Sequence, residues 1–427
     1  MREMKKTTIP FCEYIPDKWQ VLQNRYLFCN HSVKVGENYN EYQLLSLTTS
    51  GVKKKDINAS GGKVPTSYYN YQTVSNGDMI FCLFDLDCSA VFSGLSSFEG
   101  MITSAYDVFK PEEKYVDKHY IEYWFQYVFS YRYYKMYSKS IRYTITSDMF
   151  KAITTPVPPI EEQRRIGEYL DSKCTQIDAL ISNAQQQIEK LKAYKQSVIT
   201  ETVTKGLDPD VTMKDSGVEW IGEIPEHWEV IRLKFLLQYI IDCPHETPNY
   251  SFDGEYYVIR TADEDYGFLR ADEQMYRLDE KEYKHRIRRL SLDKDDIVYG
   301  REGERWGLAC IVPESNKYCL GQRMMQFRCN EHIVPMFIMW ALNSKNIYVQ
   351  GCFDTLGSTS PHVNISTIIN YEIPIPSYEE QNKLASFLEE KCSRIDKLIA
   401  LKQQKIEKLQ QYKKSLIYEY VTGKKEV

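Results

Sequence analysis

The chain has 427 residues, a formal net charge of −5 and a hydrophobic fraction of 43%, the composition of a globular protein longer than one ordinary domain. It contains no run of about 18 apolar residues that could span a membrane, and its start, "MREMKKTTIPFCEYIPDKW", lacks the apolar core of a secretory signal, so we expect a cytoplasmic protein without a membrane partner. Its 11 cysteines include no C-x-x-C pair, which argues against a zinc site, and the negative net charge confines any nucleic-acid binding to local basic patches.

Residues 1–155 are expected to form a compact α+β domain. Two apolar strands with a turn between them are predicted in "GDMIFCLFDLDCSAVF", after Asn76, and a buried helix in "HYIEYWFQYVF". Basic and aromatic residues gather on segments with loop character, most densely in "YRYYKMYSKSIRY", which ends at Tyr143. The 34 tyrosines fit either a recognition surface or a β-rich core.

Residues 156–206 predict a long spacer helix. Pro-x-Pro and then Glu-Glu-Gln open it, which places acidic groups in the first turn, where the helix dipole favours them. Gly206 and the proline three residues later end it. The charged residues from Glu189 to Lys195 are expected to form its solvated outer face. A coiled-coil seam is indicated by apolar residues at every seventh position, namely Leu170, Ile177, Ala184, Leu191 and Val198.

A linker over residues 207–227 leads into a second α+β domain, expected over residues 228–373. Paired strands are predicted in "DDIVYGREGERWGLACIV", after Lys294, and a buried helix in "VPMFIMWAL". Basic residues again gather on loops, in "KEYKHRIRR" from Lys281 and in "GQRMMQ" from Gly321.

Residues 374–427 repeat the spacer helix. "PIPSYEEQNKLASFLEEKCSRIDKLI", from Pro374, matches "PVPPIEEQRRIGEYLDSKCTQIDALI", from Pro156, without a gap, and about half of the following positions are identical. The segment "IPEHWEV" at Ile224 likewise repeats "IPDKWQV" at Ile15. Two similar helices in one chain are expected to pair with each other, and an antiparallel pairing would relate the halves by a pseudo-twofold axis.

Catalytic motifs are absent from the sequence. There is no G-x-G-x-x-G between a strand and a helix, no phosphate-binding loop, no H-E-x-x-H and no G-x-S-x-G, so we expect no catalytic, metal-binding or cofactor-binding residue. The alternative is a magnesium-dependent nuclease that uses Asp85, Asp87 and Glu99, although a polar hairpin end explains these carboxylates more simply. His245 beside Glu246 is a lone histidine–acid pair.

Taken in order, the two Ile-Pro-x-x-Trp starts, the two Pro-x-Pro…Glu-Gln helices and the two variable blocks closely resemble the specificity subunit of type I restriction–modification systems. The resemblance covers almost the whole chain. It implies two target recognition domains (residues 1–155 and 228–373) that each read one half of a bipartite double-stranded DNA sequence. The two helices would form an antiparallel coiled-coil spacer.

The same resemblance implies partners that perform the chemistry. Two adenine-N6 methyltransferase subunits would dock on the helices, and motor–nuclease subunits would join them. The partners would use S-adenosylmethionine, ATP and magnesium, whereas this subunit would hold no cofactor. A solitary specificity protein that serves a methyltransferase alone is the open alternative.

The resemblance also places DNA contacts in the loops that precede the long helices, where "GSTSPHVNI" is similar to a common Gly-Ser-Thr loop of the family. The segment "KSIRYTITS" of the first half departs from that pattern. The candidate DNA-binding residues are Lys139, Ser140, Arg142 and Tyr143 in the first half, and Arg301, Arg305, Gln322, Arg323, Ser358, Thr359, Ser360 and His362 in the second.

Overall fold

The computed structural model describes residues 2–31, 33–56, 67–138, 142–353 and 361–427. The chain divides into two compact units, each of which has its own sheet and its own hydrophobic core. Unit 1 comprises Met1–Gln185 and Gln403–Val427, and unit 2 comprises Gln186–Lys402. The expected mixture of helix and sheet is confirmed. Within the described ranges, every helix is either too short or too polar to cross a membrane.

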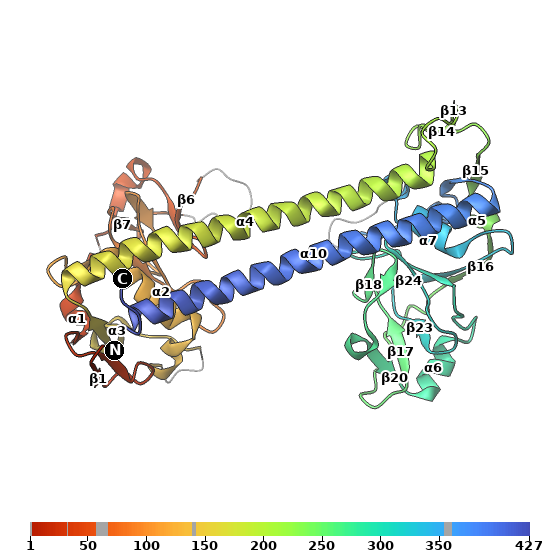
Figure 1. Cartoon of the computed structure of the whole chain (residues 1–427). Coiled ribbons are helices and arrows are strands. Elements are labelled where there is room, and N and C mark those ends of the chain that lie inside the picture. The colour runs from red at the N-terminus through yellow and green to blue at the C-terminus, as the bar shows by residue number, and fades with distance from the viewer. Residues whose placement is uncertain (1, 32, 57–66, 139–141, 354–360) are drawn as a thin grey trace. The chain divides into compact units, whose positions relative to one another are not determined.

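Two long helices dominate the structure (Figure 1). They are α4 (Ile160–Lys205) and α10 (Tyr378–Val421). They run antiparallel within each unit: Lys413 pairs with Asp178 at 2.6 Å in unit 1, and Lys195 pairs with Asp396 at 2.7 Å in unit 2. The predicted antiparallel helix pair is therefore confirmed.

Most of the predicted seven-residue seam is buried, whereas Leu191 and Val198 are partly exposed. Leu170 and Leu388 are fully buried, and Ile177, Ala184 and Ile395 are at most 5% exposed. Burial of these side chains is the main source of stability for such a pair, because apolar area removed from water contributes about 25 cal/mol per Å².

One prediction about the outer face was wrong. Lys195 is only 7% exposed, and its ammonium group pairs with Asp396 across the helices. A lysine is buried in this way only when a carboxylate compensates its charge, and the partner lies about 200 residues away in the sequence.

Unit 1 is built on a four-stranded antiparallel sheet in the order β4–β11–β8–β9. Helix α2 packs on β9 and fills the core with its aromatic side chains. The sheet strands are β4 (Phe28–Asn30), β8 (Met79–Phe81), β9 (Ser93–Leu95) and β11 (Asp107–Pro111). The other strands are β1 (Met4–Lys6), β2 (Tyr14–Pro16), β3 (Gln20–Gln23), β5 (Leu45–Thr48), β6 (Gly51–Lys54), β7 (Gln72–Val74), β10 (Gly100–Ile102) and β12 (Thr154–Val157). The short helices are α1 (Asn24–Leu27), η1 (Gly36–Glu41), α2 (Lys118–Ser130), η2 (Tyr133–Met136) and α3 (Ser147–Ala152).

Unit 2 repeats this plan with the order β16–β24–β21–β22, and α7 packs on β22. The sheet strands are β16 (Leu237–Asp242), β21 (Ile297–Gly300), β22 (Ala309–Ile311) and β24 (Met324–Cys329). The other strands are β13 (Met213–Asp215), β14 (Glu223–Pro225), β15 (Glu229–Arg232), β17 (Tyr256–Ile259), β18 (Glu264–Asp265), β19 (Phe268–Leu269), β20 (Tyr276–Leu278), β23 (Tyr318–Leu320) and β25 (Glu372–Ile375). The short helices are α5 (Leu233–Leu236), η3 (Asp272–Gln274), α6 (Glu280–Arg286), α7 (Pro335–Leu342), α8 (Lys345–Cys352) and α9 (Ile365–Ile368).

The repeated Ile-Pro-x-x-Trp segments lie at the ends of the long helices. In unit 2, Trp228 packs against Gly206, the left-handed residue (φ +73°) that follows α4. In unit 1, Trp19 packs against Gly423 (φ +70°), which follows α10. The same tryptophan contact therefore covers the C-terminal end of both long helices. The tryptophan and the glycine lie close together in the sequence only in unit 2.

The glutamine of each repeated Glu-Glu-Gln clamps a domain helix to a long helix. Gln163 accepts a hydrogen bond from the Asp117 backbone N–H at the start of α2 (2.8 Å) and donates to the Pro158 carbonyl. Gln381 accepts from the Val334 N–H at the start of α7 (2.9 Å) in the same way. Both glutamines are buried. Each motif thus satisfies an N–H group that its neighbouring helix leaves free.

Candidate nucleic-acid interface

The polar loops of unit 2 converge at one edge of its four-stranded sheet. Because β24 pairs antiparallel with both β16 and β21, it begins at the edge where they end. The segment before α9 joins this edge: Glu302 and His362 form a β-bridge, and the Val363 N–H donates to the Arg301 carbonyl at 3.0 Å. We use the name loop cluster for residues 242–247, 285–289, 301–303, 321–323 and 361–362.

Unit 1 has the same edge. The Ile145 N–H donates to the Leu83 carbonyl at 2.7 Å, beside the end of β8. These two residues correspond to Val363 and Arg301 at the 218-residue offset of the repeat. The two units therefore place their pre-helix segments against equivalent strands, even though the segments differ in sequence.

Arg301 organises the loop cluster from inside. Its side chain is 9% exposed and lies 3.1 Å from Asp242 and 2.9 Å from Glu302. Its backbone N–H also donates to the Arg323 carbonyl. Two carboxylates neutralise this guanidinium, and the contacts of Arg301 join three loops.

His245 and Asp242 form a hydrogen-bonded polar centre with Arg301. The His245 Nε2 lies 2.7 Å from Asp242, and Asp242, Cys243 and His245 are the one group of three potential metal ligands found in the described ranges. Burial raises the pKa of the Cys243 thiol, which opposes the thiolate that a metal requires. The guanidinium of Arg301 also already compensates the carboxylate. These donors fit a polar cluster better than a metal centre.

The basic run at the end of α6 is held against the first loop of the cluster. Arg286 is buried and donates to the carbonyls of Pro244, Glu246 and Leu320. Its neighbour Arg289 is exposed and donates to the Asp242 carbonyl at 2.8 Å. The run therefore contributes one structural arginine and leaves others at the surface.

Gln322 and Arg323 present the cluster's outer hydrogen-bonding groups. Gln322 donates to Thr247 at 2.9 Å, while Arg323 is half exposed and lies 3.9 Å from Glu302. Arg323 adopts φ +70°, a left-handed conformation that is uncommon for residues other than glycine and that concentrates at functional sites. An exposed guanidinium and an amide can both bond to base edges in the major groove.

Arg305 lies apart from this group. Its guanidinium donates to the Glu264 carbonyl at the β18–β19 hairpin. The Glu264 side chain is buried, and burial raises its pKa well above the usual range. The prediction that Arg305 contacts DNA remains a prediction, and the contact just described directs this side chain toward the hairpin.

The candidates of unit 1 lie beside two aspartates. Arg142 lies 3.7 Å from Asp85, and the ammonium group of Lys135 lies 4.5 Å from the centre of the Tyr143 ring. Lys135 also pairs with Asp87 at 2.7 Å. Two of the three carboxylates that the nuclease alternative requires, Asp85 and Asp87, thus have basic partners. Lys139, Ser140, Ser358, Thr359 and Ser360 lie outside the described residues.

Sequence reasoning missed the residues that support this edge. The basic run from Lys281 to Arg289 indicates the place, but no pattern in the sequence marks Asp242 or Thr247. Their roles arise from contacts between loops that are 47 to 75 residues apart, as in the bonds from Arg289 and to Thr247. The 218-residue offset could have aligned Leu83 with Arg301 and revealed the shared edge.

Comparison with protein families gives a match in the second half of the chain. Residues 225–411 match the family described as "Type I restriction modification DNA specificity domain". Two specificity subunits of Methanocaldococcus jannaschii are similar to this chain. The MjaVIII subunit is 27% identical over 66% of this chain and 64% of its own length, and the putative MjaX subunit is 25% identical over 74% and 70%. The chain thus spans slightly less than two thirds of the first of these relatives.

Comparison with solved structures supports the fold. A chain from a study of complex assembly and conformational transition of the type I R-M system superposes with a TM-score of 0.68. The superposition covers 95% of this chain and 98% of the other at 13% identity. At that identity the similarity concerns the fold alone.

Proposed function

We propose that this chain is a specificity subunit of a type I restriction–modification system and that it selects the DNA sequence on which the enzymes of such a system act. The match of residues 225–411 to the specificity domain and the similarity to two specificity subunits support this proposal. Each unit reads one half of a bipartite double-stranded target. The observation that carries this proposal is the shared sheet edge, which places different loop sequences on equivalent backbone in the two units.

In unit 2, we assign base contacts to Gln322 and Arg323, which have exposed hydrogen-bonding groups, and phosphate contacts to Arg288 and Arg289. In unit 1 the matching reader is Arg142, which has one distant carboxylate partner. Each well-placed base contact contributes about 1–3 kcal/mol of discrimination against a wrong base.

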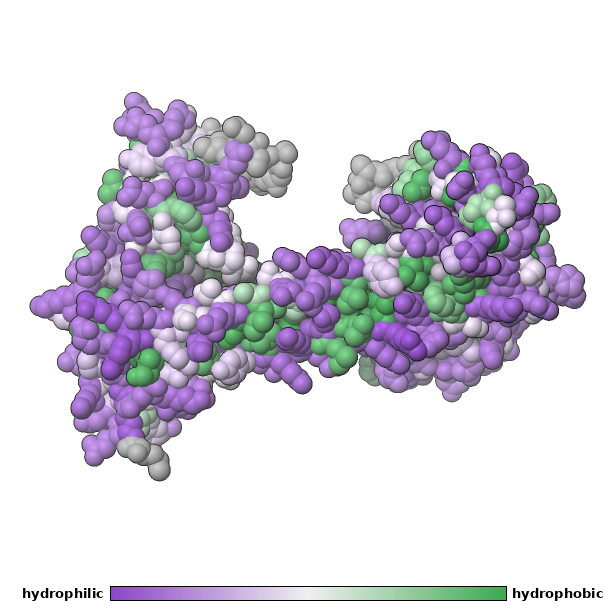
Figure 2. Space-filling view, turned by 45° about the horizontal axis from the view of Figure 1, so that its top comes forward, coloured by the Kyte–Doolittle hydropathy of each residue, from purple (hydrophilic) through white to green (hydrophobic). Residues whose placement is uncertain are grey.

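Catalysis belongs to the partners in this proposal. Two methyltransferase subunits dock on the long helices, and motor–nuclease subunits join the assembly; these partners use S-adenosylmethionine, magnesium and ATP. Exposed leucines support docking, because Leu180 and Leu398 occupy the same repeat position, one in each unit, and both face solvent. Figure 2 shows hydrophobic residues exposed along the long helices. Matching apolar platforms suit two identical partners.

Methylation mapping tests this function. The chain and its methyltransferase subunit are expressed together, and modified adenines are located by single-molecule sequencing of genomic DNA. We expect Arg323→Ala to relax one half of the recognised sequence and Arg142→Ala to weaken or relax the other. The control is Arg232→Ala, because Arg232 is exposed on β15, outside the loop cluster. A variant that altered both halves together, or an Arg323→Ala variant with the wild-type sequence preference, would count against this assignment.

A further inference from the structure

The internal repeat places the same three side chains on the paired helices of both units. A lysine–aspartate ion pair spans the helices beside a buried cysteine, with the two ammonium–carboxylate distances at 2.6 and 2.7 Å in unit 1 and at 2.7 and 2.9 Å in unit 2. The residues are Cys174, Asp178 and Lys413 in unit 1 and Cys392, Asp396 and Lys195 in unit 2.

In unit 2 the chain covers this ion pair itself. The β18–β19 hairpin places the ring of Tyr266 with its centre 5.5 Å from the Lys195 ammonium group. The next residue, Gly267, lies so close to α7 that an added Cβ would come within 3.1 Å of Met339 and 3.2 Å of Trp340. The Lys195 side chain is only 9% exposed.

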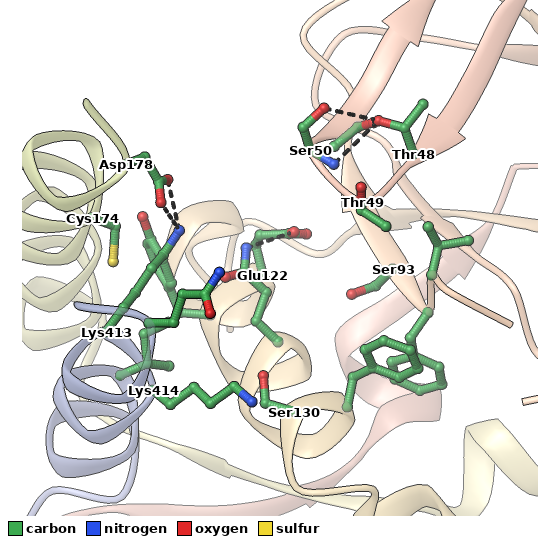
Figure 3. Close-up of a pocket in the computed structure, with 18 of the residues that line it drawn as sticks. Thr48, Thr49, Ser50, Ser93, Glu122, Ser130, Cys174, Asp178, Lys413 and Lys414 are labelled. Carbon is green, nitrogen blue, oxygen red and sulfur yellow. Dashed lines mark hydrogen bonds and ion pairs between the residues drawn. The ribbon is translucent and has the colours of Figure 1, made fainter. Parts of the chain in front are cut away.

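The equivalent hairpin of unit 1 is β5–β6, because it packs on β9 as β18–β19 packs on β22. Its turn carries Thr49 and Ser50 where unit 2 has Tyr266 and Gly267. These small side chains leave a cleft of about 810 Å³ between the hairpin, α2, α4 and α10 (Figure 3). Lys413 lines the cleft and is 26% exposed.

The wall of this cleft contains a carboxyl group that lacks one partner. Glu122 corresponds to Met339, since the glutamine clamps align Asp117 with Val334. One oxygen of Glu122 accepts from Gln126 at 3.1 Å, whereas Oε2 is buried and has no hydrogen-bond partner within the described part of the chain. Burial raises the pKa of this carboxyl group, and the amides of Gln126 and Leu95 oppose that effect. A buried polar group without a hydrogen-bond partner destabilises the folded protein, so an incoming hydrogen-bonding group would be favoured.

We propose that a turn of a methyltransferase subunit fills this cleft, with an aromatic ring over Lys413 and a hydrogen-bonding group against Glu122. The partner's turn then covers the Lys413–Asp178 ion pair in unit 1, as the β18–β19 hairpin covers the Lys195–Asp396 ion pair in unit 2. The inference rests on the proposed function, because it requires a docked methyltransferase subunit. The two docking surfaces would then differ, although the long helices that form them are nearly the same in sequence.

A protein segment fits the cleft better than DNA does. Asp178 and Glu122 lie in the same lining as Lys413 and Lys414, so a phosphate backbone would meet carboxylates as well as ammonium groups. The ammonium group of a partly buried lysine attracts the face of an aromatic ring. The copy in unit 2 uses this same contact with its own tyrosine.

A variant that copies the turn of unit 2 into unit 1 tests the inference. Thr49→Tyr combined with Ser50→Gly should place the chain's own ring over Lys413 and close the cleft. Native mass spectrometry of the full chain titrated with methyltransferase subunit should show two bound subunits for the wild type. For the variant we expect the second subunit to bind at least about tenfold more weakly. Lys53→Tyr is the matched control, because it adds a ring to the same hairpin at an exposed position outside the cleft lining.

A photo-crosslinking residue at position 50 of the otherwise wild-type full-length chain gives a second readout that does not depend on closing the cleft. We expect it to cross-link to one segment of the methyltransferase subunit in the assembled complex. Unchanged binding of two subunits by the closed variant, or a cross-link to DNA alone, would overturn the inference and leave the proposed function intact. A wild-type chain that bound no methyltransferase subunit would instead refute the proposed function.

Discussion

Neighbouring charged side chains in this protein differ in burial and therefore in the hydrogen-bonding groups that they leave available. Arg301 and Arg323 lie at the same sheet edge, yet Arg301 is enclosed by two carboxylates and Arg323 is half exposed. An enclosed guanidinium has its donors satisfied within the protein, whereas an exposed one keeps them available for a ligand. Residue type alone gives the two arginines equal weight, and only the contacts show that one is enclosed by carboxylates and the other is half exposed.

A histidine pair at the junction of α2 and α4 gives a pH-dependent prediction. His119 lies 2.8 Å from Asp171, and this hydrogen bond raises the pKa of His119. A histidine whose pKa is raised by folding stabilises the folded state below its unfolded pKa of about 6.5, and the stabilisation is lost as the pH rises through the folded value. We therefore expect His119→Gln to lower the free energy of unfolding at about pH 5.5 and to have less effect at about pH 8.5. Urea unfolding of both proteins at the two pH values measures this, and equal effects would contradict it.

The repeated glutamines connect sequence and architecture at the scale of the elements. Gln163 and Gln381 were notable in the sequence only as parts of a helix start, and the structure shows that each also holds the first turn of a domain helix. This clamp ties the first turn of α2 to α4 in unit 1 and the first turn of α7 to α10 in unit 2.

Removal of either clamp should affect one unit only. Gln163→Ala leaves the Asp117 N–H without its partner and should destabilise unit 1 by about 1–3 kcal/mol. Gln381→Ala should do the same to unit 2 through Val334. Hydrogen–deuterium exchange of the full-length variants can locate the effect, and we expect faster exchange in α2 for the first variant and in α7 for the second. Faster exchange in both helices with either variant would show that the clamps do not act separately.

Elements with a long period or a repeat could be predicted from the sequence, and isolated short ones could not. The seven-residue rows of Leu170 and Leu388 predict α4 and α10 because many positions report the same face. The two strand pairs after Asn76 and Lys294 are also confirmed. The β18–β19 hairpin gives no such signal, since its strands have two residues each. Its contact with Lys195 depends on tertiary structure, and the sequence pattern therefore predicts the wrong face for that lysine.

For the candidate site, the sequence predicted which residues lie together better than it predicted the contacts that each of them makes. Arg301, Gln322, Arg323 and His362 come together at one edge, and Arg142 lies at the matching edge of the other unit. The sequence could not show that Arg301 is enclosed, because Asp242 is 59 residues away and belongs to another strand.

Across the whole molecule, duplication explains how one chain carries two similar units with different loops, which the proposed function treats as two readers. The long helices and the Ile-Pro-x-x-Trp segments are retained in both halves, and the loops at the sheet edges differ. Two readers on a common spacer recognise half-sites whose separation follows the spacer length. In the proposed function, the loops therefore select the two half-sites, and the helices set the length of the gap between them.

Lengthening the spacer tests this division of labour most directly. One heptad is inserted into α4 after Gln185 and one into α10 after Lys402, so that the antiparallel seam stays in register. Seven helical residues add about 10.5 Å, the length of about three base pairs. Sequencing of modified adenines in cells that carry the lengthened chain and its methyltransferase should show both half-sequences unchanged and the gap between them longer. Altered half-sequences, or an unchanged gap in an active complex, would contradict the account.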